Sequence, residues 1–393
     1  MQIGYSQNVI TPSLDRPVFL AGFGQNRRAE TIHDDLYVRA LALKDEKTTL
    51  VLTALDLVGF FRREALEVAR RVHEKTADAQ VIVASIHTHH GPDTMGLWGL
   101  DDKTSGVDRQ YLSTLVDKIV STILDALSKM QPAVLKTISV HVPGVAKNAR
   151  DPEIVDNELT VAQFIHPKSG KVLASLFDFP CHPEVLWEHN PHISADYPGF
   201  VRREVEKATR APYIFFAGAL GGMMTPDVKE HSFKEAESMG KRLAVEGLKA
   251  LKEKGMSDQL PVISVRKKEV SIKLTNILFK IAFKRGLLPD TRNKKGEVIT
   301  EVNLVKIGPL WLATIPGEML PKLGLALKAS LRVAGAGIAG ILGLANDELG
   351  YILPKEDFRY PLNPLNPGKH YEESMSVSKE MGVKVMEAVK SLF

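Results

Sequence analysis

The feature that most restricts the fold of this chain is a pattern of two strands, a helix and a further strand that occurs three times in 393 residues. Internal repeats of this kind indicate one supersecondary unit used repeatedly. The first unit is predicted to contain strands at Val38–Leu43 and Thr49–Leu55, a helix at Arg62–Lys75 and a strand at Gln80–Ile86. A histidine-rich segment that begins at His87 follows its last strand.

The other two units have the same order of elements. The second is predicted to contain strands at Leu159–Ile165 and Val172–Phe179, a helix at Pro198–Thr209 and a strand at Tyr213–Ala217. The third is predicted to contain strands at Glu301–Ile307 and Leu310–Ile315, a helix at Leu320–Val333 and a strand at Gly337–Leu344. The pattern therefore predicts an α/β fold with mixed β-sheets flanked by helices, built from repeated ββαβ-like units.

Side chains of the types that bind metals or substrates follow the predicted strands. They are His87, His89, His182, Thr225, Glu318 and Tyr351. Polar groups at the ends of apolar strands are costly to bury without partners. Because equivalent strand ends gather at one edge of such sheets, we expect the functional site at the C-terminal ends of the strands.

Composition narrows the class of protein further. Hydrophobic residues are 44% and charged residues 25%, as in ordinary globular proteins, and the net charge of +4 is too small to indicate a nucleic-acid partner. A single cysteine, Cys181, excludes an internal disulfide and a cysteine-cluster zinc site. The N-terminal residues have no signal-peptide pattern, so we expect a cytoplasmic protein.

The remaining segments contain no clear linker, so we expect one domain over residues 1–393. Residues 266–297 carry ten Lys or Arg and three acidic residues, and within them Ile277–Arg285 is basic and amphipathic. The proline-rich stretch Pro361–Gly368 predicts an ordered loop, and Glu372–Leu392 predicts a C-terminal helix.

The segment from His87 to His90 offers two imidazoles on one face. On a strand, His87 and His89 would point to the same side and His90 to the other. The pair could bind one metal ion, or divide between a metal ligand and a hydrogen-bond donor. The alternative is a polar strand end with three histidines satisfied by ordinary hydrogen bonds.

Two later residues could complete a metal site. Strand alternation lets only one of Cys181 and His182 face it, and Cys181 could equally be a small buried hydrophobe. Glu318 either caps the helix that follows it or acts as a third ligand. Two neutral histidines and a carboxylate form a known ligand set for catalytic zinc, whereas calcium and magnesium prefer oxygen ligands. A zinc ion held in this way lowers the pKa of its bound water to about 7.

Four segments occur in the order seen in neutral ceramidases. They are His87-Thr88-His89-His90-Gly91-Pro92, Phe179-Pro180-Cys181-His182-Pro183, Ile315-Pro316-Gly317-Glu318 and the segment from Asn346 to Gly350-Tyr351. Leu36-Tyr37, Arg39-Ala40 and Asp56 fit as well. The chain resembles the N-terminal catalytic region of the neutral/alkaline, non-lysosomal ceramidase family over nearly its whole length.

This resemblance implies a zinc-dependent amidohydrolase that cleaves the N-acyl bond of ceramide or a ceramide-like lipid by zinc-activated water. The zinc ligands that it implies are His87, His182, Glu318 and Tyr351. The resemblance also places His89 and Tyr371 over the developing oxyanion as hydrogen-bond donors, and it gives Arg150 the place of a family arginine.

Thr225 stands where the family has a serine that is proposed as nucleophile or as a substrate-orienting hydroxyl. Threonine keeps the hydroxyl but restricts χ1, and a threonine nucleophile would need an activating base nearby. We therefore favour a role for Thr225 in orienting the substrate. The alternative is a turn hydroxyl bonded to local backbone.

Full-sized members of the family carry an additional C-terminal immunoglobulin-like domain, and we expect a short form without it. The substrate is then ceramide or a smaller N-acyl compound. Two other functions are considered, namely a zinc hydrolase of a non-sphingoid amide or ester, and a non-catalytic homologue that binds metal or lipid. The segment Phe279–Leu288 could border an acyl-chain groove, contact a membrane surface or be an ordinary packed helix. Asp56 either orients a ligand histidine or caps a helix.

Overall fold

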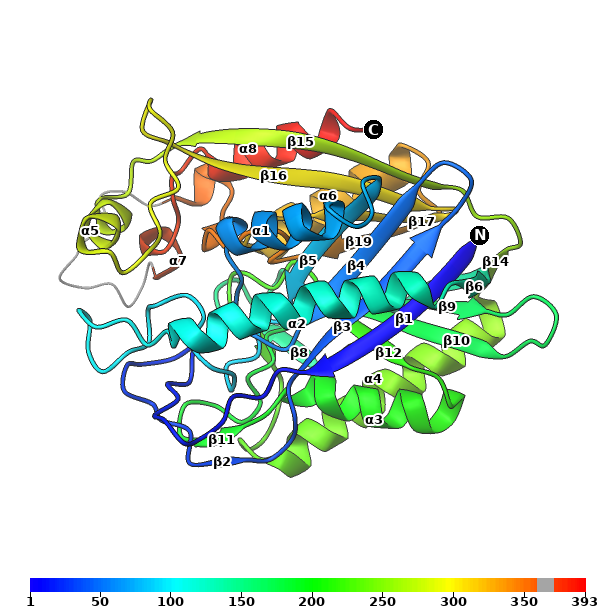
Figure 1. Cartoon of the computed structure of the whole chain (residues 1–393), viewed down its shortest axis with the longest axis horizontal. Helices are drawn as coiled ribbons and strands as arrows, with labels where there is room; N and C mark the ends of the chain where they lie inside the picture. Colours follow the sequence, from blue (N-terminus) through cyan, green and yellow to red (C-terminus); the bar gives the residue numbers. More distant parts are fainter. Residues whose placement is uncertain (359–370) are drawn as a thin grey trace.

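The computed structural model describes residues 1–358 and 371–393 and contains three main sheets (Figure 1). The first has the strand order β5-β4-β3-β1-β6, the second β12-β10-β9-β7-β14 and the third β15-β16-β17-β19. The strands of the first sheet are β1 (Gln2–Val9), β3 (Tyr37–Lys44), β4 (Thr49–Leu55), β5 (Ala79–Ser85) and β6 (Gln131–Pro132).

The strands of the second sheet are β7 (Val134–His141), β9 (Glu158–Ile165), β10 (Val172–Phe179), β12 (Tyr213–Ala217) and β14 (Met256–Asp258). Those of the third are β15 (Ile263–Lys273), β16 (Glu297–Ile307), β17 (Leu310–Thr314) and β19 (Ile338–Leu342). The helices are α1 (Arg62–His73), α2 (Arg109–Ser128), α3 (Tyr197–Thr209), α4 (Phe233–Lys254), α5 (Ile277–Arg285), α6 (Pro321–Val333), α7 (Tyr371–Ser374), α8 (Met381–Lys390) and the 3₁₀ helix η1 (Lys355–Asp357).

Each sheet contains one of the three predicted units. In every unit an antiparallel strand pair is followed by a crossover helix and a strand that runs parallel to the second member of the pair. The pairs are β3 with β4, β9 with β10 and β16 with β17, and the parallel strands are β5, β12 and β19. The threefold pattern and the α/β class are therefore confirmed, whereas the single domain over residues 1–393 stays a prediction.

The last strands of the three units lie together, and β12 contacts both β5 and β19. Backbone hydrogen bonds join their ends, from the Gly343 N–H to the Ala217 carbonyl at 2.8 Å and from the Ser85 N–H to the Leu344 carbonyl at 3.2 Å. The loops that follow these strands consequently start from one place in the fold. Segments from distant parts of the sequence therefore meet there.

The sequences of β3 and β4 are almost entirely apolar because both strands are buried. Six consecutive residues in each strand are buried, because helices or neighbouring sheets cover both faces. Helix α1 packs Ala65, Val68 and Val72 inward, and α2 lies across the strands of the first sheet (Figure 1). The Asp108 side chain caps the N-terminus of α2 by accepting hydrogen bonds from two backbone N–H groups.

Three short ladders hold the loops in place at the strand ends. Strand β8 (Ala146–Asn148) pairs with β13 (Met224–Pro226), and β2 (Thr31–Ile32) pairs with β11 (His192–Ile193). The third ladder joins β18 (Glu318–Met319) to β20 (Tyr351–Ile352) in parallel, with Glu318 opposite Tyr351. This register places two of the expected metal ligands beside each other.

The prediction of one continuous C-terminal helix over Glu372–Leu392 is wrong. The segment forms α7 and α8, which are separated by residues 375–380. The Asn276 side chain donates hydrogen bonds to the carbonyls of Ser374 and Ser376, at 2.7 and 2.8 Å, and so competes with helix formation. The predicted loop Pro361–Gly368 lies outside the described residues.

Both roles considered for Asp56 are also wrong. Its carboxylate is buried and accepts hydrogen bonds from the Arg39 guanidinium at 2.8 Å and from the Tyr37 N–H at 2.9 Å. The pair links β3 to the end of β4. Within residues 1–358 and 371–393, no helix is both long and apolar enough to cross a bilayer.

We predict that Asp56→Ala lowers the free energy of unfolding by about 3–5 kcal/mol, because it leaves the buried Arg39 guanidinium without a counter-charge. Denaturant titration measures this change. The matched control is Asp117→Ala, which removes an exposed ion pair with Arg71 and should cost less than about 1 kcal/mol. Equal losses in the two variants would show that the Arg39–Asp56 pair contributes no more than a surface pair.

Candidate functional site

Three buried imidazoles, those of His87, His89 and His182, form the centre of the site. One ring nitrogen of each lies within 4.8 Å of the others. The ring centroids are 4.9 Å apart for His87 and His89 and 5.0 Å apart for His87 and His182. His87 and His89 follow β5, and His182 follows β10. This group could hold a metal ion.

Backbone carbonyls fix the orientation of two of these rings. The Nδ1 atom of His87 lies 2.5 Å from the Val58 carbonyl, and that of His182 lies 2.9 Å from the Met224 carbonyl. A carbonyl oxygen can only accept, so each Nδ1 carries a proton and each Nε2 faces the centre of the site. Metal-binding histidines are usually oriented by such a hydrogen bond to the second nitrogen.

The prediction that His87 and His89 share a face is confirmed, but strand alternation is not the reason. Strand β5 ends at Ser85, and His87 has a φ of 71°, in the left-handed region. The loop thus bends sharply and directs both rings inward. The side chain of His90 points elsewhere, with Nε2 at 3.7 Å from the Asp196 carboxylate.

The Glu318 carboxylate lies between His87 and His182. Its Oε2 atom is 3.0 Å from Nε2 of His182 and 3.5 Å from Nε2 of His87. Burial alone would raise the pKa of Glu318, but the charge of His87 and the hydrogen bond from His182 hold it well below its usual range. The helix-cap alternative is wrong, because α6 is preceded by Leu320 and no side chain caps it.

The close approach of two backbones maintains this arrangement. A Cβ added to Gly221 would lie 2.3 Å from the Glu318 carbonyl oxygen, so only glycine fits there. Gly22 has a φ of 99°, and a Cβ there would lie 2.2 Å from Cγ of His89. These glycines let the loops pack directly against the carboxylate and imidazole.

Tyr351 reaches the same carboxylate. Its side chain is 5% exposed, and its hydroxyl forms a hydrogen bond with Glu318 and lies 3.5 Å from the Met223 sulfur. Burial and the Glu318 charge raise the pKa of Tyr351 well above its usual value. The structure therefore brings together all four expected ligands, His87, His182, Glu318 and Tyr351.

Glu184, for which the sequence predicted no role, contacts two of the expected catalytic residues. The residue is fully buried, and Oε2 lies 3.2 Å from Nδ1 of His89. Its carboxylate also accepts a hydrogen bond from the Thr225 hydroxyl. The signal in the sequence was a carboxylate two residues after His182, within an apolar segment where a charge is costly to bury.

Helix α7 connects Tyr371 and Arg150 to the site. Tyr371 is the first residue of α7, and its ring centroid is 5.7 Å from that of Tyr351. Tyr371 as a whole is 45% exposed, but burial of its phenol in the site and the Glu318 charge raise its pKa to about 12. Arg150 donates to the carboxylates of Glu372 and Glu373, at 2.8 and 2.9 Å. Arg150 therefore anchors α7 beside the site, and its guanidinium also donates to the Asp357 carbonyl at 3.4 Å.

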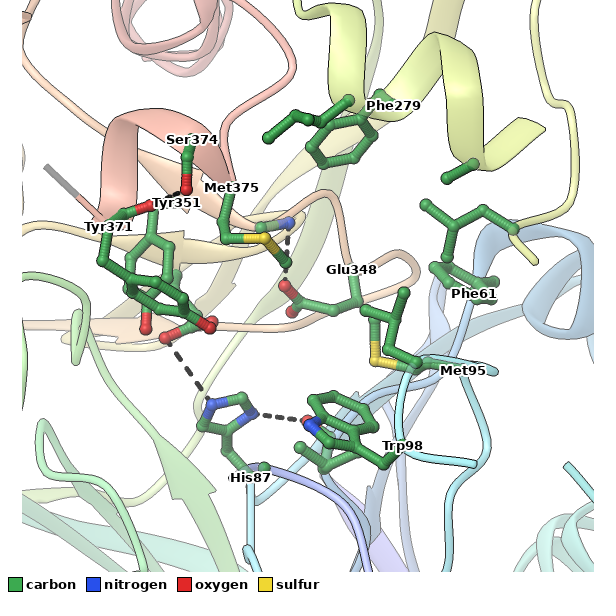
Figure 2. Close-up of a pocket in the computed structure, with 18 of the residues that line it drawn as sticks. Phe61, His87, Met95, Trp98, Phe279, Glu348, Tyr351, Tyr371, Ser374 and Met375 are labelled. Atoms are coloured by element: carbon green, nitrogen blue, oxygen red, sulfur yellow. Dashed lines mark hydrogen bonds and ion pairs between the residues drawn. The ribbon is translucent and has the colours of Figure 1, made fainter. Parts of the chain in front are cut away.

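An apolar cavity of about 190 Å³ adjoins this cluster (Figure 2). His87, His89, Glu318, Tyr351 and Tyr371 line one part of its wall. The other lining residues are mainly apolar and include Phe61, Met95, Trp98, Leu278, Phe279 and Leu288. Helix α5 thus forms part of the pocket wall, which supports the acyl-groove interpretation of this segment over that of an ordinary packed helix.

The donor set suits zinc. Ligands about 2.0–2.1 Å from a tetrahedral zinc ion lie roughly 3.3 Å from one another. The separations of 3.0 and 3.5 Å between the Glu318 oxygen and the two imidazole nitrogens match this value. Two of the four ligands are imidazole nitrogens, which suit zinc, whereas calcium and magnesium prefer oxygen ligands alone.

Solved structures share this fold. Neutral ceramidase from Pseudomonas aeruginosa matches all of this chain and 75% of its own chain, with a TM-score of 0.80 and 19% sequence identity. A ceramidase complexed with C2 matches the same shares of the two chains, with a TM-score of 0.79 and 17% identity. At these identities the likeness shows the fold alone.

Sequence comparison gives the family. No curated protein sequence matches the chain. The profile of the neutral/alkaline non-lysosomal ceramidase N-terminal region matches residues 1–238, which include the histidine cluster, Glu184 and Thr225. This match covers more than half of the chain, and the fold agrees with it. The chain therefore belongs to the neutral/alkaline non-lysosomal ceramidase family.

Proposed function

We propose that the protein is a zinc-dependent amidohydrolase that cleaves the N-acyl bond of ceramide or a ceramide-like lipid. The observation that carries this proposal is the Glu318 carboxylate held between two oriented Nε2 atoms at the wall of an apolar pocket. The pocket suits an alkyl chain and excludes water from the bond to be cleaved. Membership of a ceramidase family supports the choice of an amide substrate.

The ligands in this proposal are His87, His182, Glu318 and Tyr351. When bound, zinc supplies a Lewis acid that polarises the amide carbonyl and makes a coordinated water more acidic. The two histidines are already in the required orientation, because their Nδ1 protons are donated to backbone carbonyls and their Nε2 atoms face the site. The four side chains thus need little rearrangement to bind the ion.

We assign proton transfer to His89. Burial lowers the pKa of His89 to about 4, so the free ring is neutral, and its Nδ1 proton is directed to Glu184. Nε2 then carries a lone pair and can accept the proton of the attacking water and return it to the leaving amine. This assignment differs from the donor role that the family resemblance implied for His89.

Tyr371 retains the oxyanion role. With a pKa of about 12 its phenol stays protonated at neutral pH and can donate to the negative oxygen of the transition state. Thr225 orients the substrate, and its hydroxyl is held by Glu184. Arg150 acts through its ion pairs with α7, which carries Tyr371.

We predict that the purified protein binds about one zinc per chain and that Glu318→Ala and His87→Ala lose both the metal and the activity. His89→Ala should retain zinc and lose turnover, because His89 is assigned to proton transfer. Elemental analysis and ceramide hydrolysis measure the two properties. His189→Ala, at an exposed histidine outside the cluster, is the control. Zinc loss in His89→Ala would instead make that residue a ligand.

The substrate panel separates the proposal from its two alternatives. Ceramide hydrolysed faster than plain N-alkyl amides and esters would support the ceramidase assignment. Faster hydrolysis of a non-sphingoid amide or ester would favour the first alternative. Stoichiometric zinc without hydrolysis of any substrate would favour a non-catalytic metal- or lipid-binding homologue.

We predict that Glu184→Gln lowers kcat by about 10–100-fold, the usual effect of removing a carboxylate that orients an active-site histidine. The zinc content should remain unchanged, because Glu184 contacts His89 and Thr225 and is not an expected ligand. Glu188→Gln, at an exposed position in the same loop, is the matched control. Full activity of Glu184→Gln would remove Glu184 from the proposed mechanism.

We also propose that α5 rests on an anionic lipid surface while its inner face lines the pocket. Ile277, Leu278 and Ile281 are 63%, 45% and 41% exposed on this helix. Lys280 and Lys284 are exposed beside them, so an apolar surface and positive charge coincide where a lipid would enter. Such a helix is typical of interfacial binding, with about 1 kcal/mol for each basic residue near an anionic surface.

We predict that Lys280→Glu combined with Lys284→Glu weakens binding to phosphatidylglycerol vesicles by at least about tenfold, because two attractive charges are reversed. Vesicle sedimentation measures the binding. Val333→Ser, which alters a residue 91% exposed on α6, is the control and should bind like the wild type. Undiminished binding of the double variant would exclude α5 as the contact.

A further inference from the structure

Glu348 places a carboxyl group in the apolar pocket beside the histidine cluster. The residue is 4% exposed and lines the cavity, together with Phe61, Met95 and Phe279. Figure 2 shows its side chain reaching into the space between Met375 and Trp98. Neither the ligand set nor the catalytic residues of the proposed mechanism include it.

One oxygen of this carboxyl has a partner and the other does not. Oε1 accepts a hydrogen bond from the Gly350 N–H at 2.9 Å. Oε2 is buried and makes no hydrogen bond to any part of the chain that the structure describes. An unsatisfied buried oxygen is costly, so its presence in a binding pocket indicates a partner supplied by a ligand.

The surrounding structure holds the side chain in this position. The Glu348 N–H donates to the Asp347 carboxylate at 3.0 Å, and the same carboxylate atom accepts the Arg62 N–H at 3.1 Å. The aliphatic part of Glu348 packs against Gly59, where an added Cβ would lie 3.0 Å from Cγ of Glu348. These contacts fix the carboxyl in the pocket wall. An acidic residue that moved freely at the surface would lack them.

The chemistry of the oxygen selects the ligand group. A carboxyl oxygen accepts a hydrogen bond from an aliphatic hydroxyl whether the acid is ionised or neutral. An ether or ester oxygen can only accept, so it pairs with the neutral acid alone, whereas a hydroxyl pairs with both forms. A ligand carboxylate would be repelled by the Glu318 charge. A hydroxyl on an otherwise apolar ligand therefore suits both Oε2 and the lining of the cavity.

We propose that Glu348 forms a polar subsite that selects N-acyl lipids carrying a hydroxyl group near the amide over plain N-alkyl amides. This inference rests on the proposed function, which it refines by naming the residue that distinguishes the two substrate classes. Glu348 is then a specificity-determining residue, and the alkyl parts of the substrate occupy the apolar remainder of the pocket.

The test compares binding of two probes to the zinc-loaded full chain by isothermal titration calorimetry. The probes are 1-decanol and its isomer 1-methoxynonane, which cannot donate a hydrogen bond. The wild type should bind the alcohol about tenfold tighter, the value of one hydrogen bond in a buried site. Glu348→Leu and Glu348→Met should bind both probes equally.

Two variants keep the test decisive if one of them folds poorly. Both replace the carboxyl by an apolar group of similar size, and thermal melting checks that each is folded. Met95→Leu, at the apolar position next to Glu348 on the cavity wall, is the matched control and should retain the preference for the alcohol. An equal affinity of the wild type for both probes, or a preference retained in the two Glu348 variants, would overturn the subsite. Tighter binding of decylamine than of 1-decanol would overturn the choice of a hydroxyl.

Hydrolysis of a matched substrate pair gives the second measurement. N-Octanoyl-2-amino-1-octanol and N-octanoyl-2-aminooctane differ only in the hydroxyl. The wild type should favour the first by about tenfold in kcat/KM, and Glu348→Leu should remove this difference. If neither compound is hydrolysed, the proposed function fails, whereas the calorimetric preference still tests Glu348 by itself.

Discussion

The arrangement of this site depends on one carboxylate between two imidazoles. Glu318 can lie there because the rings of His87 and His182 are each tied through Nδ1 to a backbone carbonyl. The Nε2 atoms are consequently directed to one point. Without these bonds each ring could rotate, and the distances that fit a zinc ion would be lost. Gly221 contributes by allowing the chain to pass directly beside Glu318.

The fold supplies this geometry through its threefold architecture. The three ββαβ units place their last strands side by side, so the loops that follow them begin at one location. His87 comes from the first unit, His182 from the second and Glu318 from the third. A site of this kind needs all three units, because no unit contains more than part of the ligand set. Two helices complete the adjoining apolar pocket (Figures 1 and 2). Helix α5 comes from the segment between β15 and β16, and α7 from the C-terminal segment.

Buried carboxyl groups lie both at the histidine cluster and in the apolar pocket beside it. Glu184 lies beside His89 and Thr225, and Glu348 has one oxygen with no hydrogen-bond partner among the described residues. Both residues lie within two or three positions of an expected ligand in the sequence, at His182 and Tyr351. Their position in the sequence was not enough to assign their roles, because a carboxylate next to a ligand is often a solvated loop residue. Whether such a carboxylate is buried, and where its side chain points, depends on contacts with distant segments of the chain.

The sequence by itself determined the three units, because hydrophobic runs, turns and helical periodicity are local properties. It also indicated the side chains that converge, since polar residues at apolar strand ends are costly unless they meet partners. Tertiary structure decided the rest. Packing turned His87 inward through a left-handed backbone, paired Asp56 with Arg39, interrupted the C-terminal helix through Asn276 and buried Glu184. Each of these outcomes depends on a contact between residues far apart in the chain, which no local pattern can encode.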